Sequence, residues 1–69
     1  MNIGKTLKKF RKRSGMTQHE LSFYSDVTIT YISLIENNHR EPSIKFLRQA
    51  CEAMDFDIDF FFKHAIYND

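Results

Sequence analysis

The 69-residue chain contains few of the residues that cross-link or interrupt a fold. Its single cysteine, Cys51, excludes a disulfide within the chain. Its three histidines, His19, His39 and His64, lie far apart in the sequence without a second thiol, which argues against a zinc site. One proline and two glycines leave no flexible linker. We therefore expect a single domain over residues 1–69, without metal or cofactor.

Long apolar segments are also lacking. No run of the sequence is long enough to span a membrane, and the first residues lead into lysines rather than into the apolar segment of a secretory signal. A lone thiol is typical of a reducing compartment. No nucleophile–base arrangement is visible either, and Cys51 falls in an apolar stripe. These absences predict a cytoplasmic protein that does not contact membranes and is not an enzyme.

Positive charge is concentrated at one end of the chain. Residues 1–14 hold six bases and no acid, whereas the other 55 residues hold four bases and nine acids. A basic arm on an acidic body is a pattern that nucleic-acid binders can show. A solvated helix face explains the charge alone equally well.

Periodicity and capping residues predict an all-α protein of five helices. The first covers residues 3–14 and ends at Gly15. Thr17 and Glu20 form a capping box for a helix that runs to about Ser25, and Asp26 then turns the chain.

The next segment is ambiguous, because residues 27–32 are rich in β-branched side chains that alternate as in a strand. We favour a helix from a Thr28 cap to about Asn37, since a lone strand would have no partner. A fourth helix is expected after a Ser43 cap, and Asp57 caps the fifth.

Four of the seven phenylalanines crowd near the C-terminus. Phe60, Phe61 and Phe62 together cover about 200° of a helix, whereas a core-facing stripe covers roughly 100°, so at least one must face outward. A chain this short buries only about 60% of its unfolded surface, which favours association with a second chain. We expect a dimerisation helix over about residues 58–67, with Phe46 as a further aromatic neighbour. The expected interface residues are Phe56, Phe60, Phe61 and Tyr67. The alternative is that two of the rings fill the core and the others stay partly exposed.

Three sequence motifs occur in a fixed order. Thr-Gln-x-x-Leu begins at Thr17, Val-Thr-x-x-x-Ile-Ser-x-Ile-Glu at Val27, and Arg-x-Pro-Ser at Arg40. With these motifs, the chain from Ile3 to about Phe62 resembles the lambda-repressor-like (Xre-type) family of helix-turn-helix DNA-binding domains. The resemblance places the motif at about residues 17–37. Asp26 and Asn38 stand where the family often has glycine, and Ile29 where a polar residue is common, so Ile29 would contact a thymine methyl group rather than donate a hydrogen bond.

The resemblance implies that the second helix of the motif lies in the major groove of double-stranded DNA. The implied base contacts are Thr30, Tyr31, Ser33 and Ile29. The implied phosphate contacts are Gln18, Thr28, Asn37, Asn38, His39 and Arg40, with Lys5, Lys9 and Arg13 as weaker candidates. It also pairs Arg11 with Glu36 as a partly buried ion pair. The alternative for the polar side chains is an ordinary solvated face.

The function implied is a sequence-specific transcriptional regulator that binds inverted-repeat operators as a homodimer and controls its own gene. Restriction–modification controller proteins and phage Cro-type repressors are regulators of this size. The alternative is an antitoxin, which binds a toxin protein as well as its own promoter. RNA polymerase is a further partner that a regulator of this kind implies.

Overall fold

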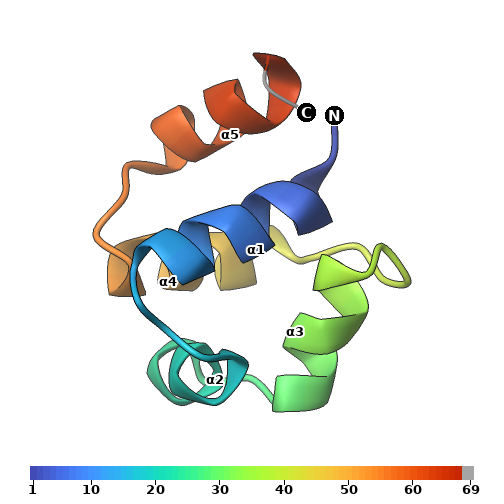
Figure 1. Cartoon of the computed structure of the whole chain (residues 1–69), viewed down its shortest axis with the longest axis vertical. Coiled ribbons are helices and arrows are strands. Elements are labelled where there is room, and N and C mark those ends of the chain that lie inside the picture. The colour runs from blue at the N-terminus through green and yellow to red at the C-terminus, as the bar shows by residue number, and fades with distance from the viewer. Residues whose placement is uncertain (68–69) are drawn as a thin grey trace.

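The computed structural model describes residues 1–67, which form five α-helices and no strand. They are α1 (Ile3–Arg13), α2 (Gln18–Ser25), α3 (Ile29–Glu36), α4 (Ile44–Ala53) and α5 (Ile58–Tyr67). The predicted all-α, five-helix architecture is confirmed, and the ambiguous segment after Asp26 is helical. Figure 1 shows α1 in the middle of the molecule, with α5 on one side of it and α2 and α3 on the other. None of the helices within the described range is long and apolar enough to cross a membrane.

Polar side chains cap the helices where the sequence places them. Thr17 accepts the Glu20 amide at 3.1 Å, and the Glu20 carboxylate accepts the Thr17 amide at 2.9 Å, which completes the predicted capping box. Thr28 and Ser43 each accept the amide three residues further on, both at 3.0 Å. Asp57 accepts an amide of the first turn of α5 at 2.8 Å. These bonds fix where each helix begins.

Four residues adopt a left-handed backbone conformation at helix ends. Gly15 ends α1 with φ of 72°, and Asp26 ends α2 with φ of 58°. Asn38 follows α3 with φ of 60°, in the position where the family often has glycine. Asp55, after α4, has φ of 61° and is the one of the four that the sequence did not indicate. The turn between α2 and α3 therefore depends on the tolerance of aspartate for this conformation.

The core lies where the five helices meet. Leu7 and Phe10 of α1 are fully buried, and the Phe10 ring is edge-on to Phe61 with centroids 5.2 Å apart. Cys51 is 2% exposed, as expected for a core residue. The other buried apolar residues are Leu21, Ile32, Ile35, Phe46, Leu47, Ala50, Met54 and Ala65.

Gly4 permits a close approach between α1 and α3. A Cβ atom at this position would lie 2.1 Å from the backbone oxygen of Ile35, well inside van der Waals contact. Any side chain at position 4 would therefore force the two helices apart. The sequence alone does not indicate this role of Gly4, because nothing local requires a glycine there.

The aromatic residues of α5 divide between core and surface. Phe61 is fully buried, so its expected place in a dimer interface is wrong. Phe60 and Tyr67 are 52% and 79% exposed. Phe56 is partly buried and stacks on Phe60 with ring centroids 6.1 Å apart. A helix that packs one face against α1 and α4 turns its neighbouring residues outward, which is why consecutive phenylalanines differ in exposure.

Candidate nucleic-acid interface

The N-terminal end of α3 forms an exposed polar surface. Ile32 and Ile35 anchor the inner face of the helix in the core with exposures of 0% and 1%. Thr28, Ile29 and Thr30, at the N-terminal end of the helix, are exposed. The structure thus brings together the side chains that sequence reasoning assigned to the start of the recognition helix.

A buried ion pair holds α3 against the start of the chain. The Arg11 Nε atom donates to Glu36 Oε2 at 2.7 Å, and Arg11 Nη2 donates to Oε1 at 3.0 Å. A third donor, Arg11 Nη1, reaches the backbone oxygen of Met16 at 2.8 Å. The two side chains are only 8% and 2% exposed. This two-pronged contact fixes the orientation of α1 relative to α3.

Gln18 belongs to the same network. Its side-chain Nε2 donates to Glu36 Oε1 at 3.0 Å, so the first residue of α2 is tied to the last residue of α3. Gln18 is expected to contact a phosphate, and this bond engages its amide nitrogen on Glu36 instead. The first amides of α2 lack intrahelical acceptors, and this positive helix end still suits an anion.

Tyr31 connects α3 to the beginning of α4. Its hydroxyl oxygen accepts a hydrogen bond from the Ser43 amide at 3.1 Å. Its ring meets the buried Phe46 ring edge-on, with centroids 5.1 Å apart. Phe46 therefore packs beneath Tyr31 and does not belong to the aromatic group that we expect at the C-terminal end. The Arg40 guanidinium carbon lies over the Tyr31 ring, 4.8 Å from its centroid.

The remaining expected phosphate contacts lie at the other end of α3. Asn37 donates from Nδ2 to the backbone oxygen of Ser33 at 2.9 Å, so this side chain already serves its own helix. Asn38, His39 and Arg40 are exposed in the following loop. This loop presents polar and cationic groups beside α3 without burying them.

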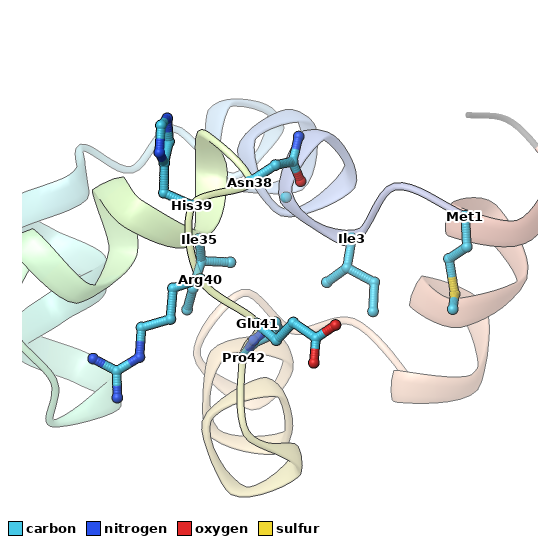
Figure 2. A pocket seen from close by; sticks show the side chains of 9 residues that line it. Met1, Ile3, Ile35, Asn38, His39, Arg40, Glu41 and Pro42 are labelled. Carbon is cyan, nitrogen blue, oxygen red and sulfur yellow. The ribbon is translucent and has the colours of Figure 1, made fainter.

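An open groove of about 610 Å³ separates this loop from the start of α1. Ile3, Ile35 and Pro42 give it apolar walls (Figure 2). Figure 2 shows the His39 and Arg40 side chains pointing in different directions rather than converging on the groove. The groove therefore lacks the convergent polar groups by which a small-molecule site fixes its ligand.

The basic arm does not form a uniform surface. Lys5, Lys8 and Lys12 are exposed on α1. Lys9, a weaker phosphate candidate, instead lies against α5, with its Nζ atom 3.2 Å from Nε2 of His64. Desolvation, followed by the positive charges of Lys9 and Arg13, lowers the pKa of His64. Sequence reasoning missed this contact because it depends on how α5 packs.

The residues that could support catalysis are dispersed. Within residues 1–67, no three histidine, cysteine, aspartate or glutamate side chains lie close enough to hold a metal ion. Burial, with a smaller contribution from Asp57, raises the pKa of the Cys51 thiol to about 11. A thiol of this kind stays protonated and is a poor nucleophile at neutral pH.

Comparison with known proteins identifies the class to which this geometry belongs. Residues 7–61 match the helix-turn-helix family model. The chain belongs to this family of DNA-binding transcriptional regulators, which is not an enzyme class, and the Xre-type resemblance is confirmed.

The chain is similar to curated regulators and to a solved controller protein. It is 36% identical to the uncharacterized HTH-type transcriptional regulator YqaF of Bacillus subtilis over 86% of this chain and 78% of that protein. It is 32% identical to the HTH-type transcriptional regulator SinR of Bacillus licheniformis over 97% and 57%, respectively. The structure of a variant of the restriction–modification controller protein C.Esp1396I superposes with a TM-score of 0.85 at 32% identity, covering 99% of this chain and 94% of that one. The chain spans between 38% and 57% of the three longer curated regulators that it matches.

Proposed function

We propose that the protein is a sequence-specific transcriptional regulator of the cytoplasm that inserts α3 into the major groove of its operator. The observation that supports this proposal best is the exposed first turn of α3, held in place by the Arg11–Glu36–Gln18 network. A rigid element that presents short polar side chains at its N-terminal end suits readout of base edges.

The proposed contacts divide by chemistry. Thr30 and Ser33 would donate to or accept from base edges, and the Ile29 side chain, 42% exposed, would contact a thymine methyl group. Phosphate contacts would come from the start of α2 and α3 and from the loop after α3. These contacts are Gln18, Thr28, Asn37, Asn38 and His39. Phosphate contacts would position the protein, while base contacts would specify the sequence.

The substitutions in the solved variants of C.Esp1396I draw attention to the part of this surface around Tyr31. In that protein, alanine replaces a threonine, the tyrosine directly after it, or an arginine as far beyond the tyrosine as Arg40 lies beyond Tyr31. This chain has Thr30, Tyr31 and Arg40 with the same order and spacing.

We further propose that two copies associate through α5. Phe60, Ile66 and Tyr67 are exposed on this helix, which lies on the opposite side of α1 from α3 (Figure 1). A dimer through α5 would therefore cover apolar surface and leave both recognition helices available. Each copy would bind one half of an inverted repeat, with half-sites about 34 Å apart.

The experiment that tests the regulator function uses the DNA immediately upstream of the gene that encodes this protein. We expect binding to this duplex in preference to a scrambled duplex of the same length, with affinity that falls steeply as salt rises. Binding of equal strength to both duplexes, or affinity unchanged between low and physiological salt, would contradict the proposal. A footprint of paired half-sites in this segment would support control of its own gene.

One observation favours a second candidate function, that of an antitoxin. Phe23 and Tyr24 of α2 are 76% and 62% exposed and meet edge-on with centroids 5.2 Å apart. Because a dimer through α5 would leave this pair uncovered, it offers a surface for a different protein. Co-expression with the product of a neighbouring toxin gene tests this candidate. A stable complex that Phe23→Ser disrupts would favour it, and separate elution of the two proteins would exclude it.

A further inference from the structure

We propose that Tyr31 is a positioning residue that holds Arg40 so that Arg40 reads a guanine in the major groove. This assignment rests on the proposed function, because it concerns the same DNA-binding surface. It differs from the contacts implied by the sequence, in which Tyr31 reads a base and Arg40 binds a phosphate.

The recognition helix needs a cation from elsewhere to read guanine. Between Ile29 and Glu36, α3 contains no arginine or lysine. Arginine is the side chain that most often reads guanine, because two of its N–H groups match the O6 and N7 acceptors of the base. A guanine in the operator would therefore be read by a residue outside α3.

Arg40 supplies this cation, although it follows the end of α3 by four positions. Its guanidinium carbon lies 4.8 Å from the centroid of the Tyr31 ring, and Tyr31 belongs to the first turn of α3. The side chain thus returns from the loop to the ring of a residue in the first turn of α3, the turn that also contains Thr30. Figure 2 shows Arg40 extending away from Met1, Ile3 and Glu41.

The Tyr31 ring is a firm support because it is held at two places. The Ser43 amide donates to its hydroxyl at 3.1 Å, and the buried Phe46 ring packs edge-on against it at 5.1 Å. The Arg40 guanidinium lies over the face of the Tyr31 ring, and a contact of this kind uses none of the N–H groups as hydrogen-bond donors to the ring edge. Within residues 1–67 these N–H groups have no carboxylate or other acceptor.

Pre-organisation explains why the ring matters. An arginine on an exposed loop loses much side-chain entropy when it is fixed on a base, and holding it beforehand reduces that loss. The hydroxyl oxygen of Tyr31 accepts the Ser43 amide, which holds the ring against the start of α4. The principal contribution of Tyr31 to DNA recognition would therefore be to hold Arg40 in position.

The test selects binding sites from a duplex pool with a randomised centre, using the full chain and its variants. We expect the wild type to enrich a motif that contains guanine. Arg40→Ala and Arg40→Lys should each lower the preference for that guanine about 5- to 150-fold, the range for one two-pronged contact. Arg40→Lys keeps the charge, so its salt dependence should match that of the wild type.

The Tyr31 variants separate positioning from direct contact. Tyr31→Leu, which removes the ring, should lose the same guanine preference, whereas Tyr31→Phe should retain it because only the hydroxyl is absent. Arg48→Ala serves as a matched control, since it removes an exposed positive charge from α4. The control should leave the enriched motif unchanged.

The outcomes distinguish the two proposals. If the Arg40 variants weaken binding to all sequences by the same factor, Arg40 binds a phosphate and this inference fails while the regulator function stands. If Tyr31→Leu keeps the guanine preference, Tyr31 does not position Arg40. A wild type that enriches no motif overturns both proposals.

A second measurement on the free protein guards against misfolded variants. Ring currents from Tyr31 should shift the side-chain proton resonances of Arg40 upfield in the wild type and in Tyr31→Phe. The shift should be absent in Tyr31→Leu, while the other resonances show that the fold is kept. Unshifted Arg40 resonances in the wild type would show that the contact does not persist in solution, and the inference would fail.

Discussion

At the residue scale, Glu36 is the buried acidic residue that joins α3 to α1 and α2. Its carboxylate accepts hydrogen bonds from Arg11 and from Gln18, and it does so in the interior. A buried ion pair adds little net stability over apolar residues of the same size, but removal of one partner leaves the other charge buried alone. The network therefore makes the interface between α1 and α3 sensitive to a single substitution.

We predict that Glu36→Ala lowers the free energy of unfolding by about 3–5 kcal/mol, because Arg11 is left without its carboxylate. Chemical denaturation followed by circular dichroism measures the change. Glu41→Ala is the matched control, since Glu41 is exposed, and its effect should stay within about 0.5 kcal/mol. If Glu36→Ala unfolds like the wild type and binds DNA equally well, the structural role of the pair is wrong.

Gly4 is a second residue at which one substitution would disturb the contact between α1 and α3. We predict that Gly4→Ala destabilises the fold despite the higher helix propensity of alanine, because the new Cβ would lie 2.1 Å from the Ile35 oxygen. The loss should be at least the roughly 1–3 kcal/mol typical of overpacking. Thermal unfolding beside Lys8→Ala, an exposed position of the same helix, provides the comparison. A melting temperature equal to that of the control would contradict the close approach of α1 and α3.

At the scale of elements, α5 contacts α1 partly through His64. Lys9 lies 3.2 Å from His64 Nε2, and the ring of His64 contacts Phe10 edge-on at 5.2 Å. Desolvation and the nearby charges of Lys9 and Arg13 lower the pKa of His64. Protonation would therefore place a third positive charge beside two others.

We predict that stability decreases as the pH falls through and below the ordinary histidine pKa, about 6.5. In that range the unfolded chain binds a proton more readily than the folded one, so acid favours unfolding. Melting temperatures between pH 7.5 and pH 5 should fall more for the wild type than for His64→Gln, which cannot titrate. Parallel curves for the two proteins would exclude His64 as the cause.

Local chemistry made most elements predictable. Thr17, Glu20, Thr28 and Ser43 cap their helices through residues three positions away, and such short-range bonds leave a sequence signature. Asp26 likewise reveals a left-handed turn by its residue type. These features predicted where the helices begin and end.

Contacts between helices were harder to predict from the sequence. The consecutive residues Phe60 and Phe61 have equal hydrophobicity, and only the direction in which α5 packs decides that Phe61 is the buried one. The support of Arg40 by Tyr31 depends on the path of the loop after α3, and the Lys9–His64 contact joins residues at opposite ends of the chain. The Arg11–Glu36 pair was expected through family resemblance rather than through periodicity.

At the scale of the whole molecule, the dimensions of one copy determine how many copies are needed to read two half-sites of DNA. The molecule measures 28 × 25 × 21 Å, and each copy offers one recognition helix. Two recognition helices one DNA turn apart, about 34 Å, therefore require two copies. The exposed side chains of α5 provide the surface on which we propose that they meet.

We predict that Phe60→Lys or Tyr67→Lys converts a dimer into a monomer while the helix content stays unchanged, since both side chains are exposed in the single copy. Sedimentation equilibrium measures the mass. Phe61→Ala is the contrasting variant, because loss of this buried ring should cost about 3–5 kcal/mol of folding stability. A monomeric wild type at micromolar concentration would count against the dimer.

Because Cys51 is buried in the core, its reactivity can report local unfolding of the protein. The thiol is 2% exposed in α4, and its pKa of about 11 keeps it unreactive toward alkylating agents. Labelling at this position would therefore proceed only in molecules whose α4 has separated from the core. Because the chain contains no other sulfhydryl, the rate of alkylation under native conditions would report those openings directly, without an introduced labelling site.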